Sequence, residues 1–590
     1  MKLLEHYEVI NHSLNETEEE VSITVNEIAN LLSCSHRNAK IIIQNLQEQK
    51  WIKWKSGIGR GNYSTLKLLK NFELLVVELA KETITPHSID QAITLLNKYQ
   101  VKDSLQREFI DWIFHSYLSE YKDQSSNMHS RLHFPSYRPL PILDPAFVCR
   151  RSENHVMRHV FSQLVQFNQD TGDFLPHLAH FWEHNQDNTK WIFYLQKGVH
   201  FHHGKKMTAD DVCYSFWRHK QPTSAYSWMV QDLLYKVSAI QPYIVEFQLK
   251  KPCPFFLHMA ASLGGSILPN DRSSRKRFPL GTGPYRISEN TDEKLTLHVF
   301  NDYFLRRPFL EEIKIYFFPK LYDNATVIDS VPNSYDMNFY HYPYKGRELH
   351  DLERYTALDR GSKLLTFNRK NGILANDLLL RKAIVHLLSP EKMIRELGGT
   401  RHKKASHLLE QFEHGDLSRS KRRGREALAK SDYKGEPLVL ASYTGAGNEA
   451  DGQWIKEELL KEGINVSLTF HTYEHLHSLP LEEETDLLLG EQLSYESDLY
   501  TYLAAFKGDH NLLTRHLSEA DKKILEMLGE NELDTLSLCM KVEENSMQHN
   551  GHIHLYRIIQ SAFYPSYVKG IHFNALGWID FTKLWYKVKR

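Results

Sequence analysis

The sequence predicts a multidomain protein, an α+β winged helix-turn-helix followed by a large α/β domain. A length of 590 residues corresponds to about three or four structural units. Residues 33–70 contain eight basic residues and one acidic residue, although the whole chain has a net charge of −1. Such a local basic stretch is typical of a compact nucleic-acid-binding module. After about residue 135, β-like runs alternate with helical runs, which indicates α/β layers.

The composition excludes several classes of protein. With 41% hydrophobic and 25% charged residues, wholesale disorder is excluded. The five cysteines form no C-x-x-C pair, which argues against a disulfide framework and favours a reducing compartment. We find neither a signal-peptide pattern nor an apolar run of about 18 residues. We therefore expect a cytoplasmic protein with no membrane segment and no cofactor.

The first elements follow from capping residues and apolar spacing. Thr24–Glu27 has the pattern of a capping box, which begins a helix. Ser35 can cap a second helix from His36 to about Gln49. The alternating residues 51–55 and 63–69, on either side of a glycine-rich turn, predict a β-hairpin with a basic tip. This order of elements is that of a winged helix-turn-helix.

In a helix-turn-helix, the first residues of the second helix reach base edges in the major groove. Arginine suits guanine and asparagine suits adenine, while basic residues of a hairpin suit phosphates. The predicted contacts with double-stranded DNA are Ser35, His36, Arg37, Asn38, Lys40, Lys53, Lys55 and Arg60. The alternative is a small protein-interaction module with a solvated charged face.

The rest of the chain can be divided by its hydrophobic spacing and its polarity. Residues 71–121 show helical spacing with a break at Pro86, so we place the first domain at 1–121. The polar residues 122–134 are predicted to be a linker. The basic cluster Arg419–Arg425 is predicted to be a surface loop. The larger domain has candidate strands at 191–196, 244–249, 295–300 and 313–318, and candidate helices at 209–218, 377–388 and 452–461.

Residues 24–69 resemble the N-terminal domain of SgrR-type transcriptional regulators. The resemblance is carried by the run from Leu31 to Ser35, by Trp51 and Trp54, and by Gly59–Gly61. Lys50 departs from the family, which usually has glycine before the tryptophan. Because a left-handed helix cap prefers glycine, this departure leaves the end of the second helix open.

Residues 176–218 resemble the family 5, oligopeptide-type, extracellular solute-binding proteins. Further matches are Gly281–Tyr285, Phe367–Asn368 and the final segment Val568–Trp585. The resemblance implies a two-lobed, type II periplasmic-binding-protein-like domain over 135–590, with a second lobe at about 370–500 and the ligand between the lobes. Candidate ligand contacts near strand ends are Tyr137, Asn368, Tyr443 and Glu491.

Neither a metal site nor an enzyme is expected. His200, His202 and His203 form one cluster, and His549, His552 and His554 form another. With 33 histidines in the chain, chance clusters are expected. A metal site needs convergent, supported ligands. We find no G-x-S-x-G, P-loop or H-E-x-x-H motif, so no catalytic residues are predicted.

The leading hypothesis is a cytoplasmic DNA-binding transcriptional regulator whose large domain senses a small-molecule effector. The SgrR resemblance implies control of stress or transporter genes, with a sugar phosphate, sugar or peptide-like ligand. Winged helices often act as dimers, which favours a homodimer. One alternative is the solute-binding receptor of a peptide or solute ABC transporter. The other is a DNA-binding or scaffold protein whose large domain has lost its ligand.

Overall fold

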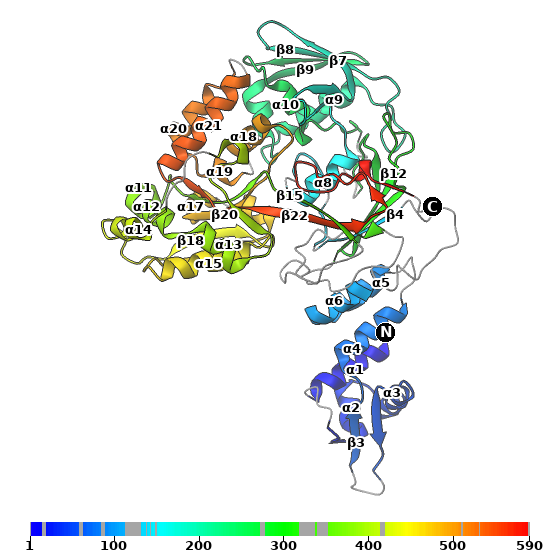
Figure 1. Ribbon diagram of the computed structural model, residues 1–590. Coiled ribbons are helices and arrows are strands. Elements are labelled where there is room, and N and C mark those ends of the chain that lie inside the picture. Colours follow the sequence, from blue (N-terminus) through cyan, green and yellow to red (C-terminus); the bar gives the residue numbers. More distant parts are fainter. Residues whose placement is uncertain are drawn as a thin grey trace. The chain divides into compact units, whose positions relative to one another are not determined.

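The computed structural model describes residues 2–14, 19–57, 63–83, 89–112, 131–136, 138–141, 143–147, 150–271, 278–317, 337–338, 352–413, 419–478, 480–508, 511–529 and 532–587. They fall into two compact units (Figure 1). One unit spans Met1–Lys122, and the other comprises Asp123–Val331 and Tyr335–Arg590. In these ranges, no helix has both the length and the apolar character needed to cross a membrane.

The first unit is a winged helix-turn-helix extended by helices on both sides. Its elements are α1 Lys2–Ser13, β1 Val21–Ile23, α2 Val25–Leu31, α3 His36–Glu48, β2 Ile52–Lys55, β3 Ser64–Leu68, α4 Phe72–Thr83, α5 Ile89–Lys98 and α6 Asp103–Trp112. The strands form an antiparallel sheet in the order β1-β3-β2. The predicted order of helix, turn, helix and hairpin is confirmed. The predicted break at Pro86 lies outside the described residues.

Both predicted helix caps form. The Thr24 hydroxyl accepts a hydrogen bond from the Glu27 amide at 3.2 Å, and the Glu27 carboxylate accepts one from the Thr24 amide at 2.7 Å. Ser35 accepts a hydrogen bond from the Asn38 amide at 3.3 Å, which fixes the first turn of α3. The opposite, apolar face of α3 is buried, through Ala39, Ile42, Ile43 and Leu46.

Helix α1, which contains both apolar and charged residues, was not predicted from the sequence. Its Tyr7 is fully buried against Trp51 and Phe72, with ring centroids 5.6 and 6.3 Å away. The Tyr7 hydroxyl donates a hydrogen bond to the Lys70 carbonyl at 2.5 Å. Burial raises the pKa of Tyr7 to about 12. Tyr7 therefore anchors α1 to the end of the hairpin.

The second unit is an α/β domain built on several sheets. Its strands are β4 Arg131–Ser136, β5 Val165–Phe167, β6 Phe174–Pro176, β7 Ala179–His184, β8 Lys190–Leu195, β9 Leu234–Gln241, β10 Ile244–Leu249, β11 Tyr285–Asn290, β12 Lys294–Val299, β13 Glu312–Phe317, β14 Met337–Asn338, β15 Leu352–Leu358, β16 Ser362–Phe367, β17 Arg401–Lys404, β18 Leu438–Tyr443, β19 Val466–His471, β20 Leu487–Gln492, β21 His552–His554, β22 Tyr556–Pro565, β23 Val568–Lys569 and β24 Trp585–Tyr586.

Helices cover these sheets. They are α8 Arg151–Val160, α9 Ala209–Trp217, α10 Phe256–Ala260, α11 Ile373–Asn376, α12 Leu378–Leu387, α13 Pro390–Leu397, α14 Lys421–Leu428, α15 Asn448–Leu460, α16 Tyr473–Ser478, α17 Leu481–Glu484, α18 Asp498–Lys507, α19 Leu512–Arg515, α20 Glu519–Glu526 and α21 Glu532–Gln548. The candidate strands and helices of this domain are all observed, with ends that shift by a few residues.

Two lobes can be distinguished by their sheets. The first lobe has a sheet in the order β7-β8-β10-β9 and another in the order β11-β12-β13-β4-β14. The second lobe has a sheet in the order β19-β18-β20-β16-β21, with its own core of residues from α12, α15 and these strands. Strand β22 directly follows β21, and its Ala562 and Tyr564 belong to the core of the first lobe. In Figure 1, β22 accordingly runs from one lobe to the other.

Three predicted boundaries differ from the structure. The predicted linker 122–134 includes Arg131–Phe134, which belong to strand β4 beside β13. The predicted second lobe, 370–500, is too short, because β16 and β21 belong to its sheet. The predicted loop at Arg419–Arg425 contains the start of helix α14, which Ser420 caps. The first two depend on pairing between distant strands, which a local pattern does not reveal.

Candidate DNA-contact face and interlobe cavity

The start of α3 presents the side chains predicted to contact bases. Ser35, His36, Arg37, Asn38 and Lys40 are all exposed. Within the described ranges, no carboxylate forms an ion pair with Arg37 or Lys40. The donors of both side chains are therefore available at the helix end where a helix-turn-helix meets DNA.

The hairpin adds a second basic face. Lys53 and Lys55 are two residues apart on β2, so their side chains lie on the same face of the sheet. Lys53 lies directly opposite Lys67 on β3. Lys55 is paired with Glu20 at 2.8 Å. Arg60, predicted at the tip of the hairpin, lies outside the described residues. Lys67 was not among the predicted contacts. The alternation of residues 64–68 nevertheless places Lys67 on the face opposite the buried Leu66 and Leu68.

The end of α3 explains the departure at Lys50. Its backbone has a φ of 58°, in the left-handed region. The Lys50 amide donates to the Gln47 carbonyl at 2.9 Å, and the Trp51 amide donates to the Leu46 carbonyl at 3.0 Å. These two bonds form a Schellman motif, in which glycine is preferred at the left-handed position. The helix therefore ends where the family's glycine would end it, with a lysine in its place.

A cavity lies between the two lobes of the second unit, and it encloses about 870 Å³, including the part open to solvent. Its size suits a small organic molecule. The start of α8 and residues 225–228 of the first lobe line it, as do the ends of β18 and β20 in the second-lobe sheet and residues of α16, α18 and α19. The lining residues are Arg138, Arg150, Arg151, Ser152, Ala225, Tyr226, Trp228, Tyr443, Ala446, Tyr473, Glu491, Gln492, Leu493, Tyr495, Tyr500, Ala504, Gly508, Asn511 and Leu512.

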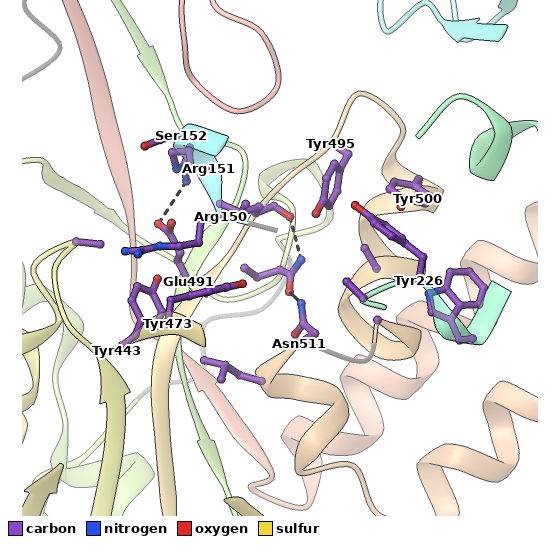
Figure 2. Close-up of a pocket in the computed structure, with 18 of the residues that line it drawn as sticks. Arg150, Arg151, Ser152, Tyr226, Tyr443, Tyr473, Glu491, Tyr495, Tyr500 and Asn511 are labelled. Carbon is purple, nitrogen blue, oxygen red and sulfur yellow. Dashed lines mark hydrogen bonds and ion pairs between the residues drawn. The ribbon is translucent and has the colours of Figure 1, made fainter. Parts of the chain in front are cut away.

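Arg150 joins the two lobes across this cavity. Its guanidinium lies over the rings of Tyr443 and Tyr473, 5.3 and 5.1 Å from their centroids. The two rings meet edge to face at 5.2 Å. Figure 2 shows the Arg150 side chain beside both tyrosines. In the part of the chain that the structure describes, no acceptor hydrogen-bonds to this guanidinium and no carboxylate is ion-paired with it.

Arg151 is held in place, unlike Arg150. It pairs with Asp359 at 2.5 Å and with Glu491 at 3.4 Å, the contact dashed in Figure 2, and it donates to the Leu576 carbonyl. Burial would raise the pKa of Glu491, but Arg151, Lys363 and Arg150 outweigh burial and hold that pKa below its ordinary value. Asp359 stands between β15 and β16, where the chain crosses between the lobes, so Arg151 connects the cavity to that crossing.

Of the four predicted ligand contacts, the structure describes three, and two of these line the cavity. Tyr443 and Glu491 line the cavity from neighbouring strand ends of one sheet. Asn368 does not line it, because its amide group donates to the Thr485 carbonyl at 2.7 Å and accepts from the amides of Lys370 and Asn371. Tyr137 lies outside the described residues. Arg150 and Tyr473 were not predicted from the sequence, because only the meeting of two lobes brings them together.

The histidines that precede Gly204 serve the fold. His202 is buried, and its Nε2 lies 3.0 Å from the Gly283 carbonyl oxygen while its Nδ1 accepts from the Gly281 amide. Burial lowers the pKa of His202 to about 4. His203 contacts Asp271 instead, at 3.1 Å. These two rings therefore face different partners.

Two family models match the chain. Residues 173–512 match the bacterial extracellular solute-binding proteins, family 5 Middle. Residues 2–113 match the sugar transport-related sRNA regulator N-terminal domain. The first model covers more than half of the chain, and the second covers the winged helix-turn-helix.

Relatives match along nearly the whole chain. The "Uncharacterized protein YhjP" of Bacillus subtilis (strain 168) is 28% identical over 99% of this chain and 100% of its own length. The HTH-type transcriptional regulators SgrR of Escherichia coli O6:K15:H31 and of Yersinia enterocolitica are 26% and 24% identical, each over 95% of both chains. The two SgrR relatives are named as transcriptional regulators.

Solved structures share the fold of the second unit. The periplasmic binding protein DppA of Helicobacter pylori in complex with the peptide STSA has a TM-score of 0.64 at 19% identity, over 77% of this chain and 98% of that one. NikA of Brucella suis in complex with Fe(III)-EDTA has a TM-score of 0.64 at 19% identity, over 78% of this chain and 100% of that one. The chain therefore belongs to family 5 of the bacterial extracellular solute-binding proteins and, with its N-terminal helix-turn-helix, to the SgrR-type transcriptional regulators.

Proposed function

We propose that this regulator acts in the cytoplasm, that it binds double-stranded DNA through the start of α3 and the β2–β3 face, and that a small anionic effector in the interlobe cavity controls this binding. The observation that carries the effector is the Arg150 guanidinium, which lies on two tyrosine rings with its hydrogen-bond donors uncommitted. The relatives named SgrR support the transcriptional role.

The DNA contacts divide into two kinds. Arg37 and Asn38, in the exposed first turn of α3, suit base edges. Lys53 and Lys67 stand opposite each other on the hairpin and suit phosphates, which any sequence provides. Two like charges facing each other destabilise a sheet, so a phosphate between them would relieve a repulsion that the free protein keeps.

Gel-shift titrations at several salt concentrations test this division, with DNA from upstream of the chain's own and adjacent genes and unrelated DNA as competitor. Arg37→Ala should lose about 1–3 kcal/mol of preference for the specific site. Lys53→Ala should weaken binding to all sequences alike and lower the salt slope by about one. Lys98→Ala, at a lysine paired with Glu5 at 2.7 Å, is the control. Equal losses on specific and unrelated DNA for Arg37→Ala would contradict a base contact.

The cavity favours an anion among the ligand classes considered. Arg138 is engaged by Glu153 at 2.6 Å, and Arg151 by Asp359 and Glu491. Arg150 is left to bind a ligand, and its planar fork matches a carboxylate or phosphate group. The tyrosine-rich wall, with Tyr226, Tyr495 and Tyr500, suits the rest of a sugar or peptide-like molecule.

Thermal unfolding of the full chain tests the effector class with sugar phosphates, the corresponding neutral sugars, and short peptides. An effector at 100 times its dissociation constant stabilises the protein by about 2.7 kcal/mol. Only anionic compounds should do so, and Arg150→Ala should abolish the effect. Arg422→Ala, at a side chain that is 84% exposed, is the matched control. Stabilisation by neutral sugars that survives in Arg150→Ala would contradict the anion.

We also propose that the regulator acts as a homodimer, as winged helices often do. Sedimentation of the full chain with and without DNA measures this. A dimer predicts two half-sites in the DNA, about one helical turn or a multiple of it apart. A monomer on a single half-site would contradict the dimer while leaving the DNA contacts in place.

A further inference from the structure

Three buried side chains converge between the last strand of the second-lobe sheet and the helix that precedes it. His552 and His554 are two residues apart on β21, so both project from one face of the sheet. Glu543 lies on α21, which packs against that face. His552, His554 and Glu543 are each 1% exposed, and their ligand atoms all lie within 4.8 Å of one another.

Each imidazole is held by one nitrogen and leaves the other nitrogen for the cluster. Nδ1 of His552 lies 2.9 Å from the Ser546 hydroxyl, and Nδ1 of His554 lies 2.8 Å from the Ser362 hydroxyl. Both Nε2 atoms are buried without a hydrogen-bond partner. Nε2 of His554 comes within 3.1 Å of Oε1 of Glu543, but not in hydrogen-bonding geometry. Fixing one ring nitrogen and presenting the other is how proteins orient metal-binding histidines.

The carboxyl group of Glu543 is buried, and both of its oxygens accept hydrogen bonds. Its Oε1 accepts a hydrogen bond from the Leu408 amide at 2.6 Å, and its Oε2 accepts one from the Tyr502 hydroxyl at 2.7 Å. In the described ranges, no lysine or arginine forms an ion pair with it. A buried carboxylate without a cationic partner is costly, and a bound cation removes that cost.

We propose that Glu543, His552 and His554 bind a divalent transition-metal ion, for which Zn²⁺ is the best fit. Two imidazole nitrogens and one carboxylate oxygen form a ligand set that Zn²⁺ accepts. With metal–ligand bonds of about 2.0–2.2 Å, the ligand atoms would stand about 3.4 Å apart, so the side chains need only a small closure. The ion would fasten α21 to β21 inside the second lobe.

From the sequence, we expected only a chance cluster at His549, His552 and His554. His549 is exposed and bonds to the backbone of its own helix, so it takes no part. The missing signal was Glu543, which lies outside the histidine run and reaches it only through the packing of α21 on the sheet.

The test uses the full chain without an affinity tag, stripped with a chelator and then equilibrated with Zn²⁺ or Co²⁺. We expect one ion per chain by elemental analysis, and a Co²⁺ absorption spectrum typical of low-coordinate nitrogen and oxygen ligands. His554→Gln and Glu543→Gln should lose the ion. Ser362→Ala, which removes only the support of His554, should weaken binding about 10–100-fold.

His516→Gln is the matched control. His516 is equally buried, with Nδ1 on the Thr366 hydroxyl at 2.8 Å and Nε2 without a partner, but it lies outside the three-residue cluster. This variant should lose stability and keep the ion. A wild-type chain that takes up no ion overturns the proposal and leaves a buried imidazole–carboxylate contact. An ion that survives in both Ser362→Ala and Glu543→Gln, each shown to be folded by circular dichroism, also overturns it.

Discussion

At the scale of single residues, Lys50 shows that a helix can keep its end position although the residue at its left-handed cap is not the preferred glycine. Helix α3 ends in the same two hydrogen bonds that a glycine would allow, although the residue in the left-handed position has a side chain. A left-handed backbone costs a residue with a side chain about 1–2 kcal/mol. That cost is borne here because the buried Trp51 and Leu46 hold the chain on both sides.

Replacing Lys50 with glycine should therefore stabilise the first unit. We expect a gain of about 0.5–1 kcal/mol, since relief of the left-handed strain is partly offset by the greater freedom of the unfolded chain. Amide hydrogen exchange of α3 in the intact chain measures it. Gln49→Gly is the control, because Gln49 has a φ of −75° and should lose stability instead. A gain in both variants would mean that strain at Lys50 is not the cause.

Single residues also explain why only part of the cavity could be predicted. Tyr443 and Glu491 each stand at the end of an apolar run, and strand ends are where ligands meet α/β sheets. Arg150 and Tyr473 have no such local signal. They come from different lobes and are more than 300 residues apart in the chain, so only folding places one over the other.

At the scale of elements, the hairpin combines a requirement of stability with one of function. Its inner face buries Leu66 and Leu68, which sets the register of β2 and β3. That register places Lys53 opposite Lys67 on the outer face, where like charges oppose sheet stability. The alternation of residues was readable from the sequence, but the pairing of these two lysines required the register.

Lys53→Thr should separate the stability of the hairpin from its binding of DNA. Removing one of the facing charges should raise the protection of β2 and β3 by about 0.2–1 kcal/mol in hydrogen exchange. The same variant should bind DNA of every sequence more weakly. Lys55→Thr is the comparison, because Lys55 is paired with Glu20 and should gain no stability when removed. If Lys53→Thr loses both stability and binding, the facing lysines are not in conflict.

At helix α14, the prediction from composition was wrong. The basic residues of this segment suggested a solvated loop, but Ser420 caps a helix there. Arg425 pairs with Glu462 at 2.6 Å, and Gly424 packs closely against Leu387 of α12. A Cβ at position 424 would stand 2.8 Å from Leu387, so the glycine permits the close approach of two helices.

At the scale of the whole molecule, buried histidines make the second unit sensitive to acid. Burial lowers the pKa values of His177, His202 and His219 to about 4. In the unfolded chain, histidine titrates near 6.5. Between these two values the unfolded chain binds more protons than the folded one, so the free energy of unfolding falls as the pH drops.

We expect stability to fall by up to about 1.4 kcal/mol per pH unit for each such histidine between pH 6.5 and 4. Denaturant unfolding at several pH values measures the slope. His219→Gln should be less stable at neutral pH and should show a shallower slope, because one buried imidazole no longer has to gain a proton. His180→Gln removes an exposed imidazole and serves as the control. An unchanged slope in His219→Gln would exclude its contribution.

The crossing between the lobes would give the proposed effector a route to the rest of the molecule. Arg557 is fully buried and donates to the carbonyls of Arg360, Gly361 and Leu408, which fixes the strand connection beside Asp359. Arg151 reaches Asp359 from the cavity wall. A ligand that changes how Arg150 and Arg151 are engaged therefore acts next to the segment where the two lobes are joined, which is where a lobe closure must bend.

The sequence by itself determined the two modules, the capped helices, the hairpin and four strands of the second unit (β8, β10, β12 and β13), because each depends on contacts within a few residues. It also determined the exposed basic first turn of α3. Only the tertiary structure decided the extent of the second lobe, the Arg150 stack in the cavity and the cluster of Glu543 with His552 and His554. Each of these requires segments far apart in the chain to meet, and the energy of such contacts leaves no periodic mark on the sequence.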